Sequence, residues 1–213
     1  MSTPPESPSS PLQNRLVDPE RFRRLIARID ALNGEDPQQD VADGSSYPRE
    51  LLYAKRLTAW VLRLVPDASE ALQIAARAQH VQRWTIPRER YPKTRQGYLR
   101  WREMLKTFHI ETTARAMREA GYDEEMIGQV GRLMSKRRLT DDPQTQALED
   151  ALCLLFLETQ FADLRRKTAA ETMAGVVRKT WGKMSPQGRA EVLKLPLSED
   201  DRKFLEAALA NEP

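Results

Sequence analysis

The sequence predicts an all-α protein in which one domain of about nine helices, residues 18–213, follows a disordered tail, residues 1–17. Apolar residues recur at helical spacing along most of the chain, whereas the alternation typical of β-strands is absent throughout. Helix start signals also recur, since Asp18-Pro19 and Asp142-Pro143 each place proline directly after an N-cap residue. The tail is rich in Ser and Pro and has no apolar periodicity, which favours disorder.

Capping residues, glycines and prolines predict where the helices begin and end. Asn33-Gly34 ends the first helix, Pro66 stops the second, and Gly121 closes the long fourth helix as a C-terminal cap. Asp67, with Glu70 three residues on, resembles a capping box and starts the third helix. The predicted helices span 18–33, 48–65, 67–84, 96–120, 123–137, 142–166, 168–183, 185–193 and 198–210, with polar loops at 35–46 and 85–94.

Length and composition restrict the class of protein. The 213 residues carry a formal charge of +3, and this small excess does not by itself imply a nucleic-acid partner. No apolar stretch approaches the ~20 residues that a membrane helix needs, and the N-terminus has no signal-peptide pattern. Because Cys153 is the only cysteine, no intrachain disulfide forms, and we expect a reducing, cytoplasmic location without a membrane partner.

The most informative segment is residues 148–157, where two acids precede seven consecutive apolar residues. A helix that is apolar all round is buried on every side. Glu149 and Asp150 therefore lie at the start of a buried helix, where carboxylates must be paired, hydrogen-bonded or bound to a ligand. The two histidines of the chain, His80 and His109, belong to other helical segments and could converge on these acids.

A polar stripe follows one face of the third predicted helix. Gln73, Arg77, His80 and Trp84 are spaced by four, three and four residues, which places them on one side of a helix. Such a stripe faces water, a partner or a cavity. Arg77 and His80, together with Arg83, form a cluster that suits an anion, although a structural histidine explains His80 alone equally well.

The segment from Arg83 to Arg102 carries the strongest anion-binding signal, because six arginines and one lysine alternate with four aromatic residues there. Arginine clamps phosphate through two hydrogen bonds at once, and aromatic rings can stack on a base. The alternative is a solvated basic loop whose aromatic residues pack into the core. The ligand-binding candidates in this segment are Arg83, Trp84, Arg88, Arg95, Tyr98 and Arg102.

Two further candidates come from the long helix and the helix after it. Tyr98, Arg102 and His109 share one face of the long helix. His109 is either a site residue or a core histidine that is hydrogen-bonded to a backbone carbonyl. Lys136 lies near a helix end, where the alternative is a solvated cation that complements the helix dipole.

Four blocks of the sequence resemble domain-of-unknown-function family 4202. They are AQHVQRW at 78–84, YLRWR at 98–102, LEDALCL at 148–154 and KTWGKMS at 179–185. The resemblance would run from about Phe22 to Leu209, which is nearly the whole predicted domain. It implies a family but no biochemistry.

The order of the helices is distantly similar to the HD superfamily of metal-dependent phosphohydrolases. Those proteins carry a His-Asp pair, further histidines and an aspartate on a later buried helix. The resemblance implies that His80 belongs to the His-Asp pair and that Asp150 matches the final aspartate. It also implies that His109 and Lys136 fall where later histidines would.

The chain departs from the HD pattern at three positions. Val81 replaces the paired aspartate, Tyr53 stands where the first histidine would be, and Lys136 replaces a later one. A protonated lysine cannot ligate a metal, and the two remaining ligands, His80 and Asp150, are too few for a tight site. We therefore expect an HD-like scaffold without a tightly bound divalent metal and without a cofactor.

These observations predict a basic pocket for a phosphate-bearing small molecule, such as a nucleotide. If the protein is an enzyme, we expect a phosphohydrolase-like hydrolase. One alternative is a non-enzymatic module that binds RNA or protein through the Arg88–Arg102 surface. Another is a structural helical protein in which the buried acids pair with arginines. Convergence in one concave pocket would favour the first hypothesis. The catalytic candidates are His80, His109, Glu149 and Asp150, and the binding candidates outside the basic segment are Arg77 and Lys136.

Overall fold

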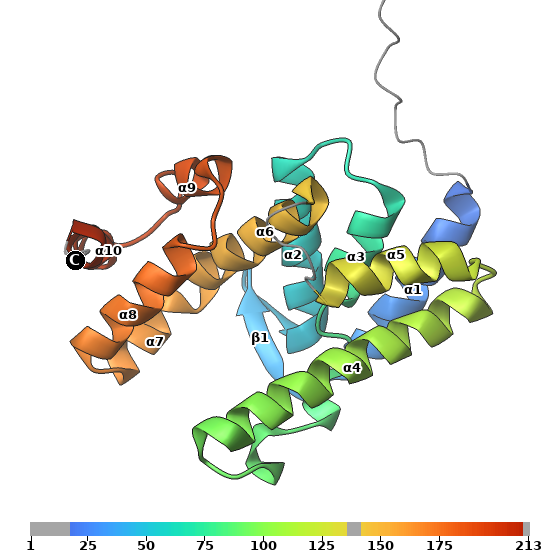
Figure 1. The fold of residues 1–213 in the computed structure, drawn as a ribbon, viewed down its shortest axis with the longest axis horizontal. Helices are drawn as coiled ribbons and strands as arrows, with labels where there is room; N and C mark the ends of the chain where they lie inside the picture. The colour runs from blue at the N-terminus through green and yellow to red at the C-terminus, as the bar shows by residue number, and fades with distance from the viewer. Residues whose placement is uncertain (1–17, 136–141, 211–213) are drawn as a thin grey trace, which may run out of the picture.

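The computed structural model describes residues 18–135 and 142–210, and within these ranges it contains ten α-helices, two short 3-10 helices and one β-hairpin (Figure 1). The predominantly helical class is confirmed, whereas the predicted count of about nine helices and the predicted absence of strands are wrong. The predicted tail, residues 1–17, lies outside the described residues. In chain order the elements are α1 (Pro19–Gly34), β1 (Gln39–Ala42), β2 (Ser45–Pro48), α2 (Arg49–Leu64), α3 (Glu70–Ala78), η1 (Arg83–Thr85), η2 (Arg88–Arg90), α4 (Arg95–Glu119), α5 (Glu124–Ser135), α6 (Pro143–Thr159), α7 (Phe161–Lys167), α8 (Ala170–Trp181), α9 (Pro186–Val192) and α10 (Glu199–Ala210).

The Asp-Pro signals start helices as predicted. The side chains of Asp18 and Asp142 accept hydrogen bonds from backbone N–H groups in the first turns of α1 and α6. These bonds satisfy donors that have no partner within the helix. The N-cap of α3, by contrast, is Ser69 and not Asp67, so the predicted capping box is wrong.

The segment predicted as a polar loop contains an antiparallel hairpin formed by β1 and β2. Ala42 pairs with Ser45, and the two residues between them, Asp43 and Gly44, have φ angles of 50° and 74°. A two-residue turn with both φ angles positive matches the strand twist, and Asp-Gly is one of its preferred sequences. The prediction missed the hairpin because its strands are short and mostly polar, and the side chain of Val41 is exposed.

The third helix ends at Ala78 and does not continue to Trp84 as predicted. Gln82 has a φ angle of 51°, a left-handed conformation that interrupts a right-handed helix. Its backbone N–H donates to Asn33 Oδ1 at 3.1 Å, so the end of α1 stabilises this turn. The predicted polar stripe therefore does not share one helix face, because His80 and Trp84 lie beyond the helix.

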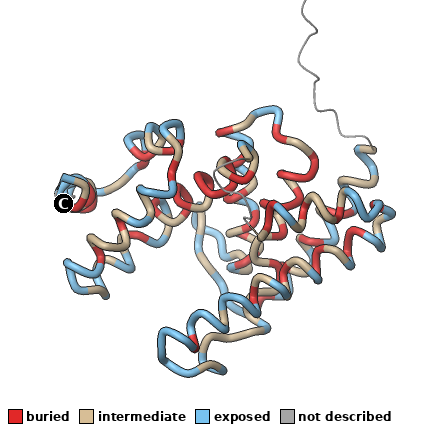
Figure 2. The backbone as a smooth tube through the Cα atoms, in the orientation of Figure 1, coloured by how far each residue is buried: buried red, intermediate tan, exposed pale blue. Residues whose placement is uncertain are grey.

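The apolar run at 151–157 lies in the core, as its composition predicts. Its residues are buried except Leu152 and Phe156, which are partly buried. The run belongs to α6, which contacts α2, α3, α5, α7 and α9 and is therefore a central element (Figures 1 and 2). The predicted helix of 142–166 is two helices, because the chain bends at Gln160 between α6 and α7.

The remaining helices surround this centre. The long α4 packs against α1 and α5, and α8 packs against α10 near the C-terminal end (Figure 1). One hydrophobic cluster includes residues from α1 through α10. Among the described residues, no helix combines the length and apolar character that crossing a bilayer requires.

Candidate functional site

Two adjoining clefts lie where α2, α4 and α6 surround the turn that follows α3. The hairpin cleft, of about 800 Å³, is bordered by the hairpin, α2, the 3-10 helices and α7. The histidine cleft, of about 530 Å³, is bordered by α4, α6 and the chain segment that follows α8. The two clefts share the side chains of Tyr53, His80, Arg83, Phe156 and Gln160.

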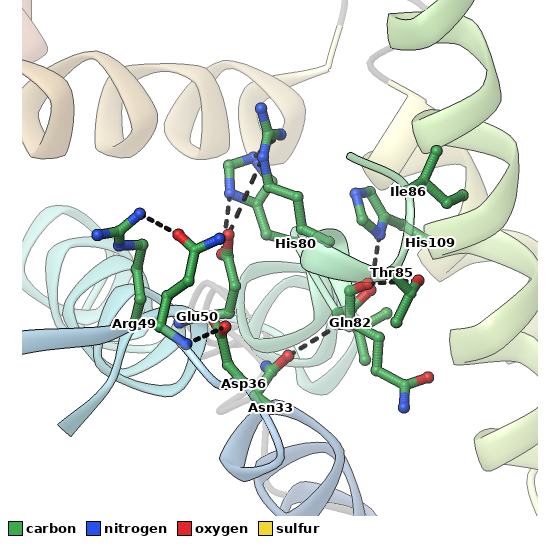
Figure 3. A network of polar contacts seen from close by, with 12 residues as sticks. Asn33, Asp36, Arg49, Glu50, His80, Gln82, Thr85, Ile86 and His109 are labelled. Carbon is green, nitrogen blue, oxygen red and sulfur yellow. Dashed lines mark hydrogen bonds and ion pairs between the residues drawn. The ribbon is translucent and has the colours of Figure 1, made fainter. Parts of the chain in front are cut away.

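Glu50 is held in this region by a buried aspartate. The backbone N–H of Glu50 donates to Asp36 Oδ2 at 3.1 Å, and the N–H of Gln38 donates to Asp36 Oδ1 at 2.9 Å. Asp36 thus satisfies a donor in the first turn of α2 while it fixes the start of the hairpin. Glu50 is itself buried and lines the hairpin cleft, with its carboxylate directed toward His80 (Figure 3).

Glu50 and His80 form the central polar pair of the site. Glu50 Oε2 lies 3.5 Å from His80 Nδ1, and Arg83 Nη1 lies 3.4 Å from His80 Nε2. Because a guanidinium only donates hydrogen bonds, this contact assigns the lone pair to Nε2 and the proton to Nδ1, which faces Glu50. The Tyr53 ring stacks on the imidazole, with centroids 4.3 Å apart and planes 14° apart, and so fixes its orientation.

Burial changes the proton affinity of the Glu50 carboxyl group in this pair. It raises the pKa of Glu50 to about 7, although the nearby Arg83 charge opposes the change. A carboxyl group with a pKa near neutral exchanges protons readily at physiological pH, which is a property of general acids and bases. The Glu50–His80 pair can therefore hold and transfer a proton at the boundary between the two clefts.

The second histidine contacts the same turn from α4. His109 Nδ1 lies 2.9 Å from the carbonyl oxygen of Val81, and a carbonyl accepts only, so Nδ1 carries the proton (Figure 3). Burial, followed by the neighbouring His80, lowers the pKa of His109 to about 3. The ring is therefore neutral at physiological pH. Its centroid lies 5.9 Å from that of His80, and the side chain lines the histidine cleft.

The histidine cleft is lined by four cationic side chains against two carboxylates. Lys183 pairs with the buried Glu149 at 3.3 Å, and Lys106 pairs with Glu103 at 2.7 Å. The other two cations are Arg83 and Arg102. Arg102 donates to the hydroxyl of Tyr98 at 3.4 Å, and no carboxylate in the described part of the chain forms an ion pair with it. The hairpin cleft, in contrast, has equal numbers of cationic and acidic residues.

Arg83 lies in the wall that both clefts share. Its guanidinium stacks over the Trp101 ring, 4.9 Å from the centroid, and the Trp101 indole N–H donates to Ile86 O at 2.9 Å. Burial is the main cause that lowers the pKa of Arg83, and the positive charge of Arg102 contributes to the lowering. The carboxylate of Glu50 opposes this lowering, since its Oε1 lies 3.9 Å from Arg83 Nε.

The structure brings five of the predicted residues together and separates others from them. Five candidates line the histidine cleft: His80, His109, Glu149, Arg83 and Arg102. Trp84 and Arg88 line the hairpin cleft instead, and Arg88 also donates to two backbone carbonyls of its own loop. Lys136 lies outside the described residues.

Four other candidates lie in neither cleft. Asp150 accepts hydrogen bonds from Gln146 and from the backbone N–H and hydroxyl of Ser185, and so it holds the segment between α8 and α9. Arg77 forms a bidentate salt bridge with Asp30 of α1. Arg95 and Tyr98 are exposed on α4.

Sequence reasoning missed Glu50 and Asp36 as site residues and did not include Tyr53 among the candidates. An acid in the first turn of a helix is usual on dipole grounds, so Glu50 carried no distinctive signal. The Asp-Gly turn of the hairpin could have indicated that the segment containing Asp36 is structured.

The donor set does not fit the metal centre of the HD superfamily. Burial raises the pKa of Tyr53, so its phenol stays protonated and is a poor ligand. The side chain of Val81 is apolar and buried. In residues 18–135 and 142–210, no cluster of three or more His, Cys, Asp or Glu side chains has an arrangement suited to a metal ion.

A mainly helical protein with a basic, histidine-lined cleft is thus the class that the fold and site define. The chain belongs to the family described as Domain of unknown function (DUF4202), whose model matches residues 23–205. Neither the curated proteins nor the solved structures include a match to this chain.

Proposed function

We propose that the protein binds a phosphate-bearing small molecule in the histidine cleft, where the guanidinium groups of Arg83 and Arg102 hold the phosphate. The observation that carries this proposal is that both cations line one cleft, where Arg83 lies 3.9 Å from Glu50 and Arg102 forms no ion pair with any carboxylate of the described residues. An anion placed there would give Arg102 the charged partner that it lacks among the described residues, and guanidinium groups match phosphate oxygens in geometry. The concave shape of the cleft suits a small ligand better than a flat surface would.

The Glu50–His80 pair adds proton-transfer capacity to this binding site. His80 lines the cleft, and its imidazole is held by Tyr53 and Glu50. A general acid at this position would assist departure of an alcohol from a phosphate ester, which is chemistry of the phosphohydrolase kind. The distant likeness to HD phosphohydrolases belongs to this proposal. The replacements at Tyr53 and Val81 imply that fixed organic cations take over charge that a metal would supply.

Binding of inorganic phosphate and of nucleoside monophosphates to purified protein, followed by thermal shift and calorimetry, tests the proposal. A ligand at 100 times its dissociation constant should stabilise the fold by ~2.7 kcal/mol. Arg102→Lys should weaken binding because an ammonium cannot clamp two phosphate oxygens. The matched control is Arg95→Lys, since Arg95 is exposed on the same helix but lies outside both clefts. Equal binding by wild type and the Arg102 variant would contradict the proposal.

A second candidate function is RNA binding through the Arg88–Arg102 surface. The favouring observation is that the N-terminal half of α4 exposes the large side chains of Tyr98 and Leu99 next to the exposed Arg95 and Arg100. Exposed aromatic and cationic side chains are the elements of single-strand recognition. This function predicts affinity for single-stranded RNA that falls steeply with salt and depends on Arg95. The Arg95→Lys and Arg102→Lys variants therefore distinguish the two functions: loss of binding in the Arg95 variant favours RNA, and loss in the Arg102 variant alone favours the small molecule.

A further inference from the structure

His109 presents one ring nitrogen that the protein itself does not use. The side chain is 4% exposed, and its Nδ1 is occupied by the hydrogen bond to Val81 O. Its Nε2 is buried and has no hydrogen-bond partner among the residues that the structure describes. A buried polar atom without a partner is costly, and such atoms are rare in folded proteins. The unused nitrogen therefore points to a group that is not part of this chain.

The bond to Val81 decides what kind of group that is. Since Nδ1 carries the proton, Nε2 presents a lone pair and can only accept a hydrogen bond. A fully ionised phosphate oxygen, which is also an acceptor, would be repelled there. A hydroxyl group, in contrast, donates to Nε2 without changing the charge of the site. The partner is thus a neutral donor, while the anionic part of a ligand suits Arg83 and Arg102 in the same cleft.

From this geometry we infer that the ligand of the histidine cleft carries a hydroxyl group close to its phosphate, and that His109 Nε2 accepts the hydrogen bond of this hydroxyl. The ligand class is a phosphorylated polyol or sugar. This inference rests on the proposed phosphate site, because it assigns the second half of the same ligand. His109 then determines specificity, since an alkyl phosphate of the same size leaves the nitrogen unpartnered.

The tautomer of His109 is testable without any ligand. The chain contains two histidines, so the ring-nitrogen NMR spectrum of the ¹⁵N-labelled full-length protein is simple, and His80→Gln assigns its signals. We expect one imidazole with a protonated Nδ1 and an unprotonated Nε2 that does not titrate between about pH 5 and 8. An Nε2-protonated tautomer for His109 would overturn the inference, because that nitrogen could no longer accept.

Glycerol 3-phosphate and propyl phosphate form the matched pair of probes, since they differ in their hydroxyl groups. Calorimetry should show that the wild type binds glycerol 3-phosphate about tenfold more tightly than it binds propyl phosphate. His109→Asn keeps a donor near Val81 O but is too short to place an acceptor at the position of Nε2, so it should abolish the difference while binding of inorganic phosphate stays within about twofold. His109→Gln places an amide oxygen near the Nε2 position and should retain part of the difference; it also serves if the Asn variant fails to fold.

The outcomes separate this inference from the proposed function. Equal affinity of wild-type protein for the two probes overturns the hydroxyl assignment and leaves the phosphate site standing. Absence of binding by inorganic phosphate and by both probes overturns the proposed function, and the hydroxyl assignment with it. A preference for glycerol 3-phosphate that survives in His109→Asn also overturns the role of His109.

Discussion

Glu50 Oε2 lies 3.5 Å from His80 Nδ1, although the two residues belong to different elements and are thirty positions apart in the chain. The separation is longer than a strong hydrogen bond, so small movements of either side chain decide whether the proton is shared. Both residues depend on α1 and the segment after it. Asp36 holds the backbone of Glu50, and Asn33 holds the turn that contains His80.

Glu50→Gln should stabilise the protein above neutral pH. The pKa of Glu50 is about 7 in the folded protein, whereas the pKa of a glutamate without such interactions, as in the unfolded chain, is 4.5. The unfolded chain therefore releases this proton at lower pH than the folded protein, and stability falls as pH rises from 4.5 to 7. At pH 8 the free energy of unfolding of the variant should exceed that of the wild type by up to about 3 kcal/mol. At pH 4 the two values should differ little. Urea unfolding at several pH values measures this difference.

The matched control for this prediction is Glu103→Gln, because Glu103 is exposed and pairs with Lys106 on the surface of α4. That variant should leave the pH dependence of the unfolding free energy unchanged. A Glu50→Gln protein with the same slope between pH 4.5 and 7 as the wild type would show that Glu50 ionises normally.

Asp36→Ala should lower both stability and phosphate affinity. The substitution removes the acceptor for two backbone N–H groups, and the loss of such a cap costs about 0.5–2 kcal/mol. Because the start of α2 then shifts, Glu50 and the stacked Tyr53 no longer hold His80. Chemical denaturation and a phosphate titration measure the two effects. Asp36→Asn retains one acceptor oxygen and should lie between the wild type and the Ala variant in both measurements.

The sequence predicts elements whose signals are local and misses features that depend on contacts between distant residues. Asp18 and Asp142 start helices because capping and proline act within one turn. The burial of 151–157 follows from its composition. The end of α3 does not follow from the local sequence, because Gln82 adopts its left-handed conformation in a contact with Asn33, forty-nine positions earlier.

The candidate site shows the same division. His80, Arg83 and Arg102 were identifiable because their residue types are rare or clustered in the sequence. Glu50 was not, because its raised pKa arises from burial, and that burial depends on contacts between elements that are distant in the chain. The acids at 149 and 150 look equivalent in the sequence, yet only Glu149 lines the histidine cleft. Adjacent helical positions point in directions about 100° apart, which separates these two side chains.

Gly97→Ala and Gly175→Ala should change stability in opposite directions. A Cβ atom at Gly97 would lie 2.1 Å from the backbone oxygen of Pro92, so the loop before α4 must move, and a cost of about 1–3 kcal/mol is expected. A Cβ atom at Gly175 has no heavy atom within 4 Å. Because Gly175 lies within α8, alanine there should stabilise the protein by about 0.5–1 kcal/mol. Thermal melts of both variants measure the difference, and a neutral Gly97→Ala would contradict this packing.

Asp150→Asn should destabilise the fold and leave the ligand site intact. The buried carboxylate accepts hydrogen bonds from Gln146 and from two donors of Ser185. An amide keeps one acceptor for Gln146 and the Ser185 N–H, but its NH₂ group can only donate to the Ser185 hydroxyl, which already accepts from Gly188, so the weakened contact costs about 0.5–1.5 kcal/mol. Ser185→Ala is the comparison, because it removes one donor and leaves the carboxylate in place. The affinity of each variant for inorganic phosphate should match that of the wild type at a temperature where both are folded. Normal stability combined with lost phosphate binding would assign Asp150 to the ligand site and would contradict the role in holding the segment between α8 and α9.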